Sequence, residues 1–322
     1  MGPCMKISIS KYIALFTTAF LIATSPASAD STAAKINIVV GISAGGLADT
    51  VARLVADMLP EHLGAQVTVI NQPGAGGSIA YQHVARAAPD GTTILATNMD
   101  PLLIRALSDD SSPGLEEFRL VGVVANAYQI LYASSKHGWT SLKDFVDAAR
   151  KDPGRYSVGV MLGASQAISL RQLQKIADLS LIEVPFKGFS EIRQNVAGGH
   201  VDLSFDTAES VLDETKFRIL AVRALNRLPE MPNVPTFKES GIDLFPFLGT
   251  YVFLVPKDTP DDIAERLTRA IGTVAASPDF KERMRGMGFQ PMEESLADYV
   301  KRLSAEKSTY RMLVETYMPK TK

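Results

Sequence analysis

The sequence predicts an α/β protein of two domains, each a mostly parallel sheet flanked by helices. Apolar runs of strand length alternate with helical patterns, glycine-rich turns follow several of these runs, and the last part of the chain changes to helices alone. Such alternation is typical of parallel sheets with helices on their faces. The expected strands are 36–42, 67–72, 92–97, 120–125, 156–161, 181–184, 201–206, 217–223 and 250–255.

The first expected helix runs over 49–62, where apolar residues recur at helical spacing and Asp49 is placed to cap the helix. Gly64 then ends it. A second helix over 78–87 repeats the scheme and is closed by the turn signal Pro89-Asp90-Gly91. The elements therefore follow one another as strand, glycine turn and helix.

The C-terminal part predicts helices without a strand between them, packed as a cover on one domain. Asp258-Thr259-Pro260 reads as a cap followed by proline in the first turn, and Ser295 starts another helix. From the strand pattern we expect domain 1 to comprise 30–123 plus 252–322, and domain 2 to comprise 124–251.

The N-terminus has the pattern of a secretory signal peptide. Lys6 and Lys11 form a positive region, 12–22 is apolar, and Ala27-Ser28-Ala29 is a small-residue cleavage site. The apolar stretch is well short of the ~20 residues that span a bilayer, which disfavours a retained anchor. We expect cleavage after Ala29 and export to the periplasm.

Composition excludes several classes of partner. Cys4 is the single cysteine, so the mature chain has neither disulfides nor thiolate metal ligands. Loss of the leader, which holds two lysines and no acid, takes the net charge from −2 to −4. Basic blocks are missing from the sequence, which argues against nucleic acid.

Two glycine-rich turns predict a site for a small anion. Ser43-Ala44-Gly45-Gly46-Leu47-Ala48-Asp49 follows the first strand, and Pro73-Gly74-Ala75-Gly76-Gly77-Ser78 follows the second. A strand that passes into a helix through glycines leaves backbone N–H groups free at the positive end of the helix dipole. Tight packing of a strand on a helix would by itself explain one such turn. Two turns that converge on one anion would explain both.

Loops in the second half follow strands in the same way, and ligands bind at the carboxyl ends of parallel strands. They are Gly163-Ala164-Ser165, Pro185-Phe186-Lys187-Gly188 and Asp206-Thr207. Lys187 is either a counter-charge in a cleft or a solvated loop lysine. Two such sheet edges that face each other would form a cleft.

One motif points to catalysis instead. Gly41-Ile42-Ser43-Ala44-Gly45 matches the nucleophile elbow of serine hydrolases. That motif normally follows several strands, whereas this one follows the first, and the late histidine of the triad is missing because the last histidine is His200. A secreted hydrolase therefore stays only as the alternative, and we expect no metal and no cofactor.

Taken together, these motifs resemble the extracytoplasmic solute receptors of the tripartite tricarboxylate transporter family, the Bug or TctC proteins. The resemblance covers nearly all of the mature chain. It rests on an ordered series of motifs: Gly45-Gly46-x-x-Asp49, Asn71-x-Pro73-Gly74-Ala75-Gly76-Gly77, Ala88-Pro89-Asp90-Gly91, Val184-Pro185-Phe186-Lys187-Gly188, Gly198-Gly199-x-Val201-Asp202, Asp206, Val234-Pro235-Thr236 and Thr259-Pro260.

The resemblance implies a two-domain periplasmic clamshell, type II-like, that binds a small carboxylate, has no enzymatic activity and acts as a monomer. Its partners would be membrane permease subunits of a tripartite tricarboxylate transporter, unless the protein is a sensor. The ligand-binding residues that it implies are Ser43, Ala44, Gly46, Asp49, Gly76, Gly77, Ser78, Thr97, Asn98, Gly163, Ala164, Ser165, Lys187 and Asp206.

The chain departs from the family pattern at three places. Ser43-Ala44 and Leu47 stand where the first loop usually has prolines, Gln166-Ala167-Ile168 replaces a serine–histidine–leucine run, and Thr250 stands where a tryptophan is common. Main-chain anchoring of one carboxylate should survive these changes.

Overall fold

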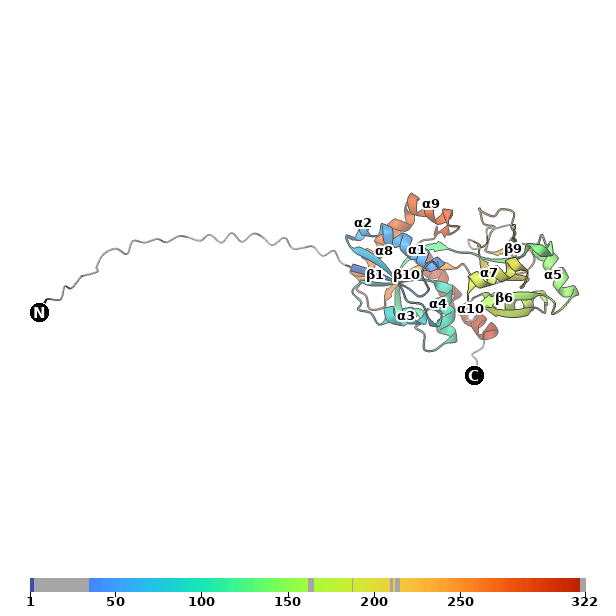
Figure 1. Cartoon of the computed structure of the whole chain (residues 1–322), viewed down its shortest axis with the longest axis horizontal. Helices are drawn as coiled ribbons and strands as arrows, with labels where there is room; N and C mark the ends of the chain where they lie inside the picture. The colour runs from blue at the N-terminus through green and yellow to red at the C-terminus, as the bar shows by residue number, and fades with distance from the viewer. Residues whose placement is uncertain (3–34, 162–164, 187, 209–210, 212–214, 319–322) are drawn as a thin grey trace. The chain divides into compact units, whose positions relative to one another are not determined.

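The computed structural model describes residues 1–2, 35–161, 165–186, 188–208, 211 and 215–318 of the chain. The part that begins at Ala33 is one compact unit, with two β-sheets that are both flanked by helices (Figure 1). Among the described residues, no helix has the length and apolar character needed to cross a membrane. The cleavage site after Ala29 lies outside the described residues and stays a prediction.

The first sheet has six strands. They are β1 (Lys35–Val40), β2 (Gln66–Asn71), β3 (Thr93–Asn98), β4 (Phe118–Asn126), β10 (Thr250–Pro256) and β11 (Gln290–Pro291). Their order is β11-β4-β10-β3-β1-β2. The pairs of β1 with β2 and with β3 are parallel, and the other pairs are antiparallel.

Helices cover both faces of this sheet. Successive strand residues point to opposite faces, and those on each face pack against a different set of helices. Ile38 and Val40 pack in the core beneath α1 (Leu47–Met58), α8 (Asp261–Ala276) and α9 (Pro278–Gly286). Val39 packs in the core beneath α3 (Ser78–Ala85), α4 (Met99–Ser108) and α10 (Leu296–Tyr317). Shorter helical turns of this part are α2 (Pro60–Leu63), η1 (Ala75–Gly77) and η2 (Leu115–Glu117).

The second sheet has five strands in the order β7-β6-β8-β5-β9. They are β5 (Gln129–Ser134), β6 (Ser157–Met161), β7 (Ile182–Phe186), β8 (Leu203–Thr207) and β9 (Phe217–Arg223). β6 pairs in parallel with β7 and β8, and β5 is antiparallel to β8 and β9. One face packs on α5 (Leu142–Lys151) and α6 (Ser165–Ala177), the other on α7 (Phe189–Gly198), and η3 (Ser135–His137) follows β5.

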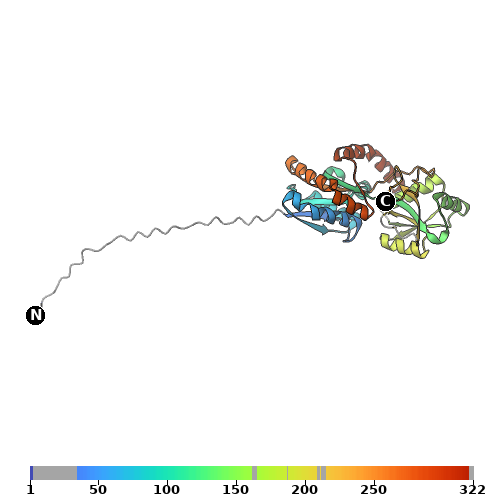
Figure 2. The same cartoon turned by 90° about the horizontal axis from the view of Figure 1, so that it is seen from above.

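The chain passes between the two sheets twice, after Asn126 and again before Thr250. The two crossing segments are joined by a hydrogen bond of 3.1 Å from Ala127 N–H to the Gly249 carbonyl. Helix α10 contacts α4 beside the first sheet and α6 beside the second (Figure 2). The domain boundaries given above stay a prediction.

The α/β fold class is confirmed, and every strand predicted from the apolar runs is present. Both sheets are mixed, with antiparallel as well as parallel pairs. The sequence patterns missed two strands. β5 follows β4 after only Ala127 and Tyr128, so the two read as one apolar run, and β11 is two residues long and lies between the C-terminal helices α9 and α10.

Two predicted helix signals are confirmed and two are wrong. Gly64 is left-handed and ends α2, and Ser295 caps α10 by accepting the Asp298 N–H at 3.1 Å. Asp49 is not the cap of α1, because Gly46 takes that position and Asp49 lies in the first turn. Asp258 is not the cap of α8 either, because the cap is Pro260.

Candidate functional site

The carboxyl ends of β1, β2 and β3 lie at one edge of the first sheet, because β1 pairs in parallel with both neighbours. β1 and β2 lead through turns into α1 and α3, and β3 leads directly into α4. The first amides of a helix have no carbonyl partner within it, and at this edge the amides of Gly45, Gly77 and Asp100 are satisfied by Asp49, the Gly74 carbonyl and Asn98. The predicted site residues of the first half lie there: Ser43, Ala44, Gly46, Asp49, Gly76, Gly77, Ser78, Thr97 and Asn98.

Gly41, which lies between β1 and the first glycine turn, contacts the second glycine turn. A Cβ on Gly41 would lie 2.9 Å from the Cα of Gly77 and 3.4 Å from the Cβ of Ala80. The end of β1 therefore packs directly on the start of α3, and only glycine fits between them. Convergence of the two turns on one anion stays a prediction.

Asp49 fixes the shape of the first turn. Its buried carboxylate accepts the N–H of Gly45, which has a φ of +82°, at 2.8 Å. It also binds the Arg53 guanidinium at 2.9 Å and the Asn71 side-chain amide at 2.8 Å. Burial raises the pKa of Asp49, but the bonds from Arg53, Gly45 and Asn71 outweigh it and hold that pKa below the ordinary value. The carboxylate is used to shape the loop.

The second turn has a left-handed backbone. Gly74, Gly76 and Gly77 have φ of +138°, +63° and +98°, and Ala75 has a φ of +47°. The Gly77 N–H closes the turn on the Gly74 carbonyl at 2.9 Å. Successive residues in such turn conformations direct their N–H groups into a concavity that binds anions.

The Ser78 hydroxyl is a buried polar group without a partner in the described part of the chain. Ser78, the first residue of α3, is 3% exposed, and its Oγ has no hydrogen-bond partner among the described residues. The preceding Gly77 supplies no side-chain cap. Buried hydroxyls are almost always hydrogen-bonded, so a hydroxyl at the start of a helix fits an anion as the missing partner.

Thr97 and Asn98 end β3 at the same edge. Thr97 Oγ1 lies 3.2 Å from the buried Tyr81 hydroxyl. The Asn98 side-chain oxygen caps α4 by accepting the Asp100 N–H at 3.0 Å. With its oxygen used in this way, Asn98 presents its amide nitrogen as a donor.

The second sheet contributes two described candidates. Ser165 is the first residue of α6 and is half-buried. Asp206 is 2% exposed, and its carboxylate accepts Arg193 and the Thr207 N–H, both at 2.8 Å. The other predicted members, Gly163, Ala164 and Lys187, lie outside the described residues.

Sequence reasoning missed a polar cluster around the fully buried Arg223. The Arg223 guanidinium donates to Gln129 Oε1 at 3.1 Å, and Gln129 Nε2 donates to Ser165 Oγ at 3.3 Å. The signal in the sequence was an arginine at the end of an otherwise apolar strand, in Ile219-Leu220-Ala221-Val222-Arg223. Arginine is rarely buried without a partner. An arginine at this position therefore predicts polar partners around it.

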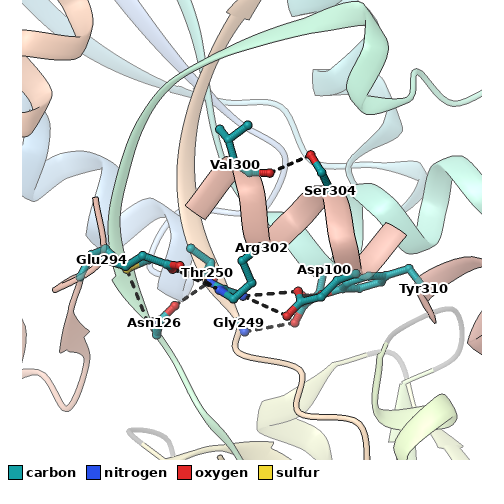
Figure 3. Close-up of polar contacts among 11 residues, drawn as sticks. Asp100, Asn126, Gly249, Thr250, Glu294, Val300, Arg302, Ser304 and Tyr310 are labelled. Atoms are coloured by element: carbon teal, nitrogen blue, oxygen red, sulfur yellow. Dashed lines mark hydrogen bonds and ion pairs between the residues drawn. The ribbon is translucent and has the colours of Figure 1, made fainter. Parts of the chain in front are cut away.

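A second buried cluster holds the crossing segment at Gly249 (Figure 3). The Asp100 carboxylate accepts the Gly249 N–H at 3.1 Å and the Tyr310 hydroxyl at 2.5 Å. A Cβ on Gly249, whose φ is +61°, would lie 2.2 Å from the Ala127 carbonyl oxygen. Thr250 donates to Asn126 Oδ1 at 2.8 Å, so both crossing segments are bound to each other next to α4.

The residues around Ser43 do not form a hydrolase triad in the described part of the chain. Ser43 is exposed. His83 binds Gln72 at 2.7 Å, and His137 pairs with Asp202 at 2.8 Å. The described residues also contain no cluster of histidine, cysteine and acidic groups that would hold a metal.

Two helix-flanked mixed sheets, joined by two crossing segments and with amide-rich turns at one sheet edge, define the class of periplasmic solute-binding proteins. The model of the tripartite tricarboxylate transporter family receptor matches residues 51–317. The chain therefore belongs to this receptor family.

Individual relatives agree with this membership. A UPF0065 protein of Pseudomonas sp. strain P51 is 31% identical over 292 residues, which cover 88% of this chain and 86% of that protein. The periplasmic binding protein BugD superposes with a TM-score of 0.75 at 26% identity, covering 89% of this chain and 99% of BugD. Rpa4515 of R. palustris, solved with adipate, gives a TM-score of 0.77 at 25% identity over 89% of this chain and 98% of that one.

Proposed function

We propose that this protein is a periplasmic receptor that captures a small carboxylate for uptake by a tripartite tricarboxylate-type transporter or for sensing. The observation that carries the proposal is the buried, unpaired Ser78 hydroxyl at the start of α3. It follows the left-handed turn 74–77, which is in contact with Gly41 just before the first turn. Family membership and the adipate-bound relative support the same class of ligand.

In this proposal, one carboxylate group of the ligand binds to main-chain and hydroxyl donors at the edge of the first sheet. The donors are the main-chain amides of Ser43, Ala44 and Gly76 with the side chains of Ser43, Ser78 and Asn98. Asp49 does not touch the ligand and holds the first turn in shape through Gly45. Residues of the second sheet then close over the rest of the ligand by bending at the two crossing segments. Binding drives closure only as far as the ligand prefers the closed form.

The cellular setting is part of the same proposal. The leader is cleaved after Ala29, the mature chain works in the periplasm as a monomer without a cofactor, and its partners are the membrane permease subunits. The receptor has no enzymatic activity. Adjacent permease genes would distinguish uptake from sensing.

A thermal-shift titration tests the proposed function. The leaderless protein is unfolded and refolded to remove any bound ligand, then mixed with adipate, succinate, citrate or hexanoate, and with the neutral diamide adipamide as the matched control. A ligand at ~100 times its Kd stabilises the folded state by ~2.7 kcal/mol, which is seen as a rise in Tm. A rise with a carboxylate but not with adipamide supports the proposal. Equal effects of both, or no rise with any carboxylate, would contradict it.

A further inference from the structure

Two exposed isoleucines lie beside the donor groups of the proposed carboxylate site. Ile42 directly precedes Ser43 and is 38% exposed, and Ile79 directly follows Ser78 in α3 and is 52% exposed. Exposed apolar residues that are scattered singly are ordinary on a protein surface. These two lie next to the two serines that the proposal assigns as donors, so a ligand held there has apolar side chains beside it.

Each isoleucine folds over the glycine turn next to it. A Cβ on Gly46 would lie 2.5 Å from Ile42 Cδ1, and a Cβ on Gly74 would lie 2.5 Å from Ile79 Cδ1. The side chain of a helical residue leans toward the helix N-terminus, which explains why Ile79 reaches back to the turn that precedes α3. Because these glycines have no side chain, an apolar group lies directly on each of the turns that carry the proposed donors.

The second sheet also has apolar side chains at the carboxyl ends of its parallel strands. Met161 ends β6, Phe186 ends β7, and the two residues are paired in register. Both are half-buried and pack against the core on the α7 face of that sheet. A Cβ on Gly159 of β6 would lie 3.4 Å from the Phe186 ring, so the ring lies over the neighbouring strand. These strand ends therefore present apolar surface that is only partly covered.

Resting on the proposed function, we propose that Ile42 and Ile79 are specificity-determining residues that select carboxylates with an apolar body. The donors of the first sheet hold the carboxylate, and the carbon chain lies against the two isoleucines. When the second sheet closes over the ligand, Met161 and Phe186 cover the chain from the other side. Ligands with hydroxyl or amino groups along the chain bind more weakly, because a polar group that is buried without a partner costs free energy.

The hydrophobic effect sets the size of the expected preference. Each methylene that moves from water into apolar surroundings increases the affinity about fourfold. Hexanoate and butyrate carry the same carboxylate, and hexanoate is longer by two methylenes. The wild type should therefore bind hexanoate about tenfold more tightly than butyrate.

The test is isothermal titration of the leaderless protein with butyrate, with hexanoate and with 3-hydroxybutyrate as the matched polar ligand. The variants are Ile42→Thr, Ile79→Thr and the double variant, since threonine keeps the branched Cβ and replaces apolar carbons by a hydroxyl. Ile182→Thr is the matched control, because Ile182 is 48% exposed and lies at the amino end of β7, away from the carboxyl ends of the strands. Thermal unfolding of each variant reports folding separately.

In the double variant the ratio of hexanoate to butyrate affinity should fall to near one, whereas Ile182→Thr keeps the wild-type ratio. A ratio that survives in the double variant overturns the inference. Equal weakening of both ligands also overturns it, because the isoleucines would then pack on protein and not on the ligand. Met161→Gln keeps the length of its side chain and should lower the ratio too, and an unchanged ratio there would contradict the part assigned to the second sheet.

Failure of this inference is distinguishable from failure of the proposed function. A wild type that binds hexanoate and butyrate equally, or 3-hydroxybutyrate as tightly as butyrate, overturns the inference and leaves the proposed function standing. The same holds for a wild type that binds only ligands with two carboxylates. A wild type that binds no carboxylate removes both.

Discussion

A hydrogen bond of 2.8 Å joins the Gly45 N–H to the carboxylate of Asp49, four residues later in the chain. It ties the tip of the first glycine turn to the first turn of α1, next to strands that supply the other turns of the candidate site. In the proposed function, this loop binds the ligand through its own amides, and its conformation is controlled by a side chain that does not contact the ligand. Residues that shape the loops are thus separate from the groups that would bind the ligand.

Asp49→Asn should weaken carboxylate binding and lower the stability at pH 7 by about 1–3 kcal/mol, because a buried acceptor of several hydrogen bonds is lost. The folded-state pKa of Asp49 is lower than its ordinary value of 3.8. The stability difference between wild type and variant should therefore be complete above pH ~4 and vanish as the pH falls through the lower, folded-state pKa. Urea unfolding from pH 2 to 7 measures it, and a difference that does not change with pH would argue against the ion pair.

Asp100 should show the opposite pH dependence. Burial raises the pKa of Asp100 above 3.8, although Tyr310, Gly249, Arg223 and Arg302 favour its charged form. The folded protein then keeps the proton to a higher pH than the unfolded chain does. Relative to Asp100→Asn, the wild type should lose stability as the pH rises from ~4 through the raised folded-state pKa. The same urea series checks this, and a rise in relative stability with pH would show that burial does not dominate.

Ser78→Ala should lower affinity without lowering stability. Its hydroxyl has no partner among the described residues, so removing it leaves the unfolding free energy unchanged or higher by about 1 kcal/mol, while a lost hydrogen bond to an anion weakens binding about tenfold or more. Ser112→Ala is the matched control, because Ser112 is also a buried serine whose hydroxyl has no partner among the described residues. Titration and thermal unfolding of both variants are the measurements. Equal affinities in the two variants would remove Ser78 from the site.

Gly41→Ala should separate the two glycine turns. The added Cβ would lie 2.9 Å from the Gly77 Cα, and relief of such overpacking costs about 1–3 kcal/mol of stability. Affinity for the ligand should fall with it, because the amides of both turns move. In Gly272→Ala, the control within α8, the Cβ meets open space and the helix gains a better helix former. The measurement is the ligand affinity of the two folded variants, by isothermal titration. Unchanged affinity in Gly41→Ala would show that the contact does not position the turns.

The sequence was sufficient for the order of strands, turns and helices, because strand-length apolar runs and the glycines at strand ends are local signals. The helix end at Gly64, which is left-handed, was also predicted from a local signal, a glycine after the last residue of a helical pattern. The cap of α1 was misplaced, because Asp49 bonds back to Gly45 from inside the first turn and a sequence cannot distinguish that from capping. β5 was missed because only two residues separate it from β4.

The candidate site depends on contacts that are distant in sequence, and these were predicted less well. The close approach of Gly41 to Gly77 depends on how β1 packs against the start of α3, which no local pattern encodes. Arg223 is more than fifty residues from Ser169 and Ser165 in sequence, and its burial was unexpected for an arginine. The ligand-binding roles assigned from the sequence remain predictions.

A crystal structure of the leaderless protein with the carboxylate that gives the largest thermal shift tests the central claim most directly. The account predicts one ligand carboxylate within about 2.7–3.2 Å of Ser78 Oγ and of the main-chain nitrogens of Ser43, Ala44 or Gly76. A carboxylate bound elsewhere, with the Ser78 hydroxyl still unpaired, would contradict it.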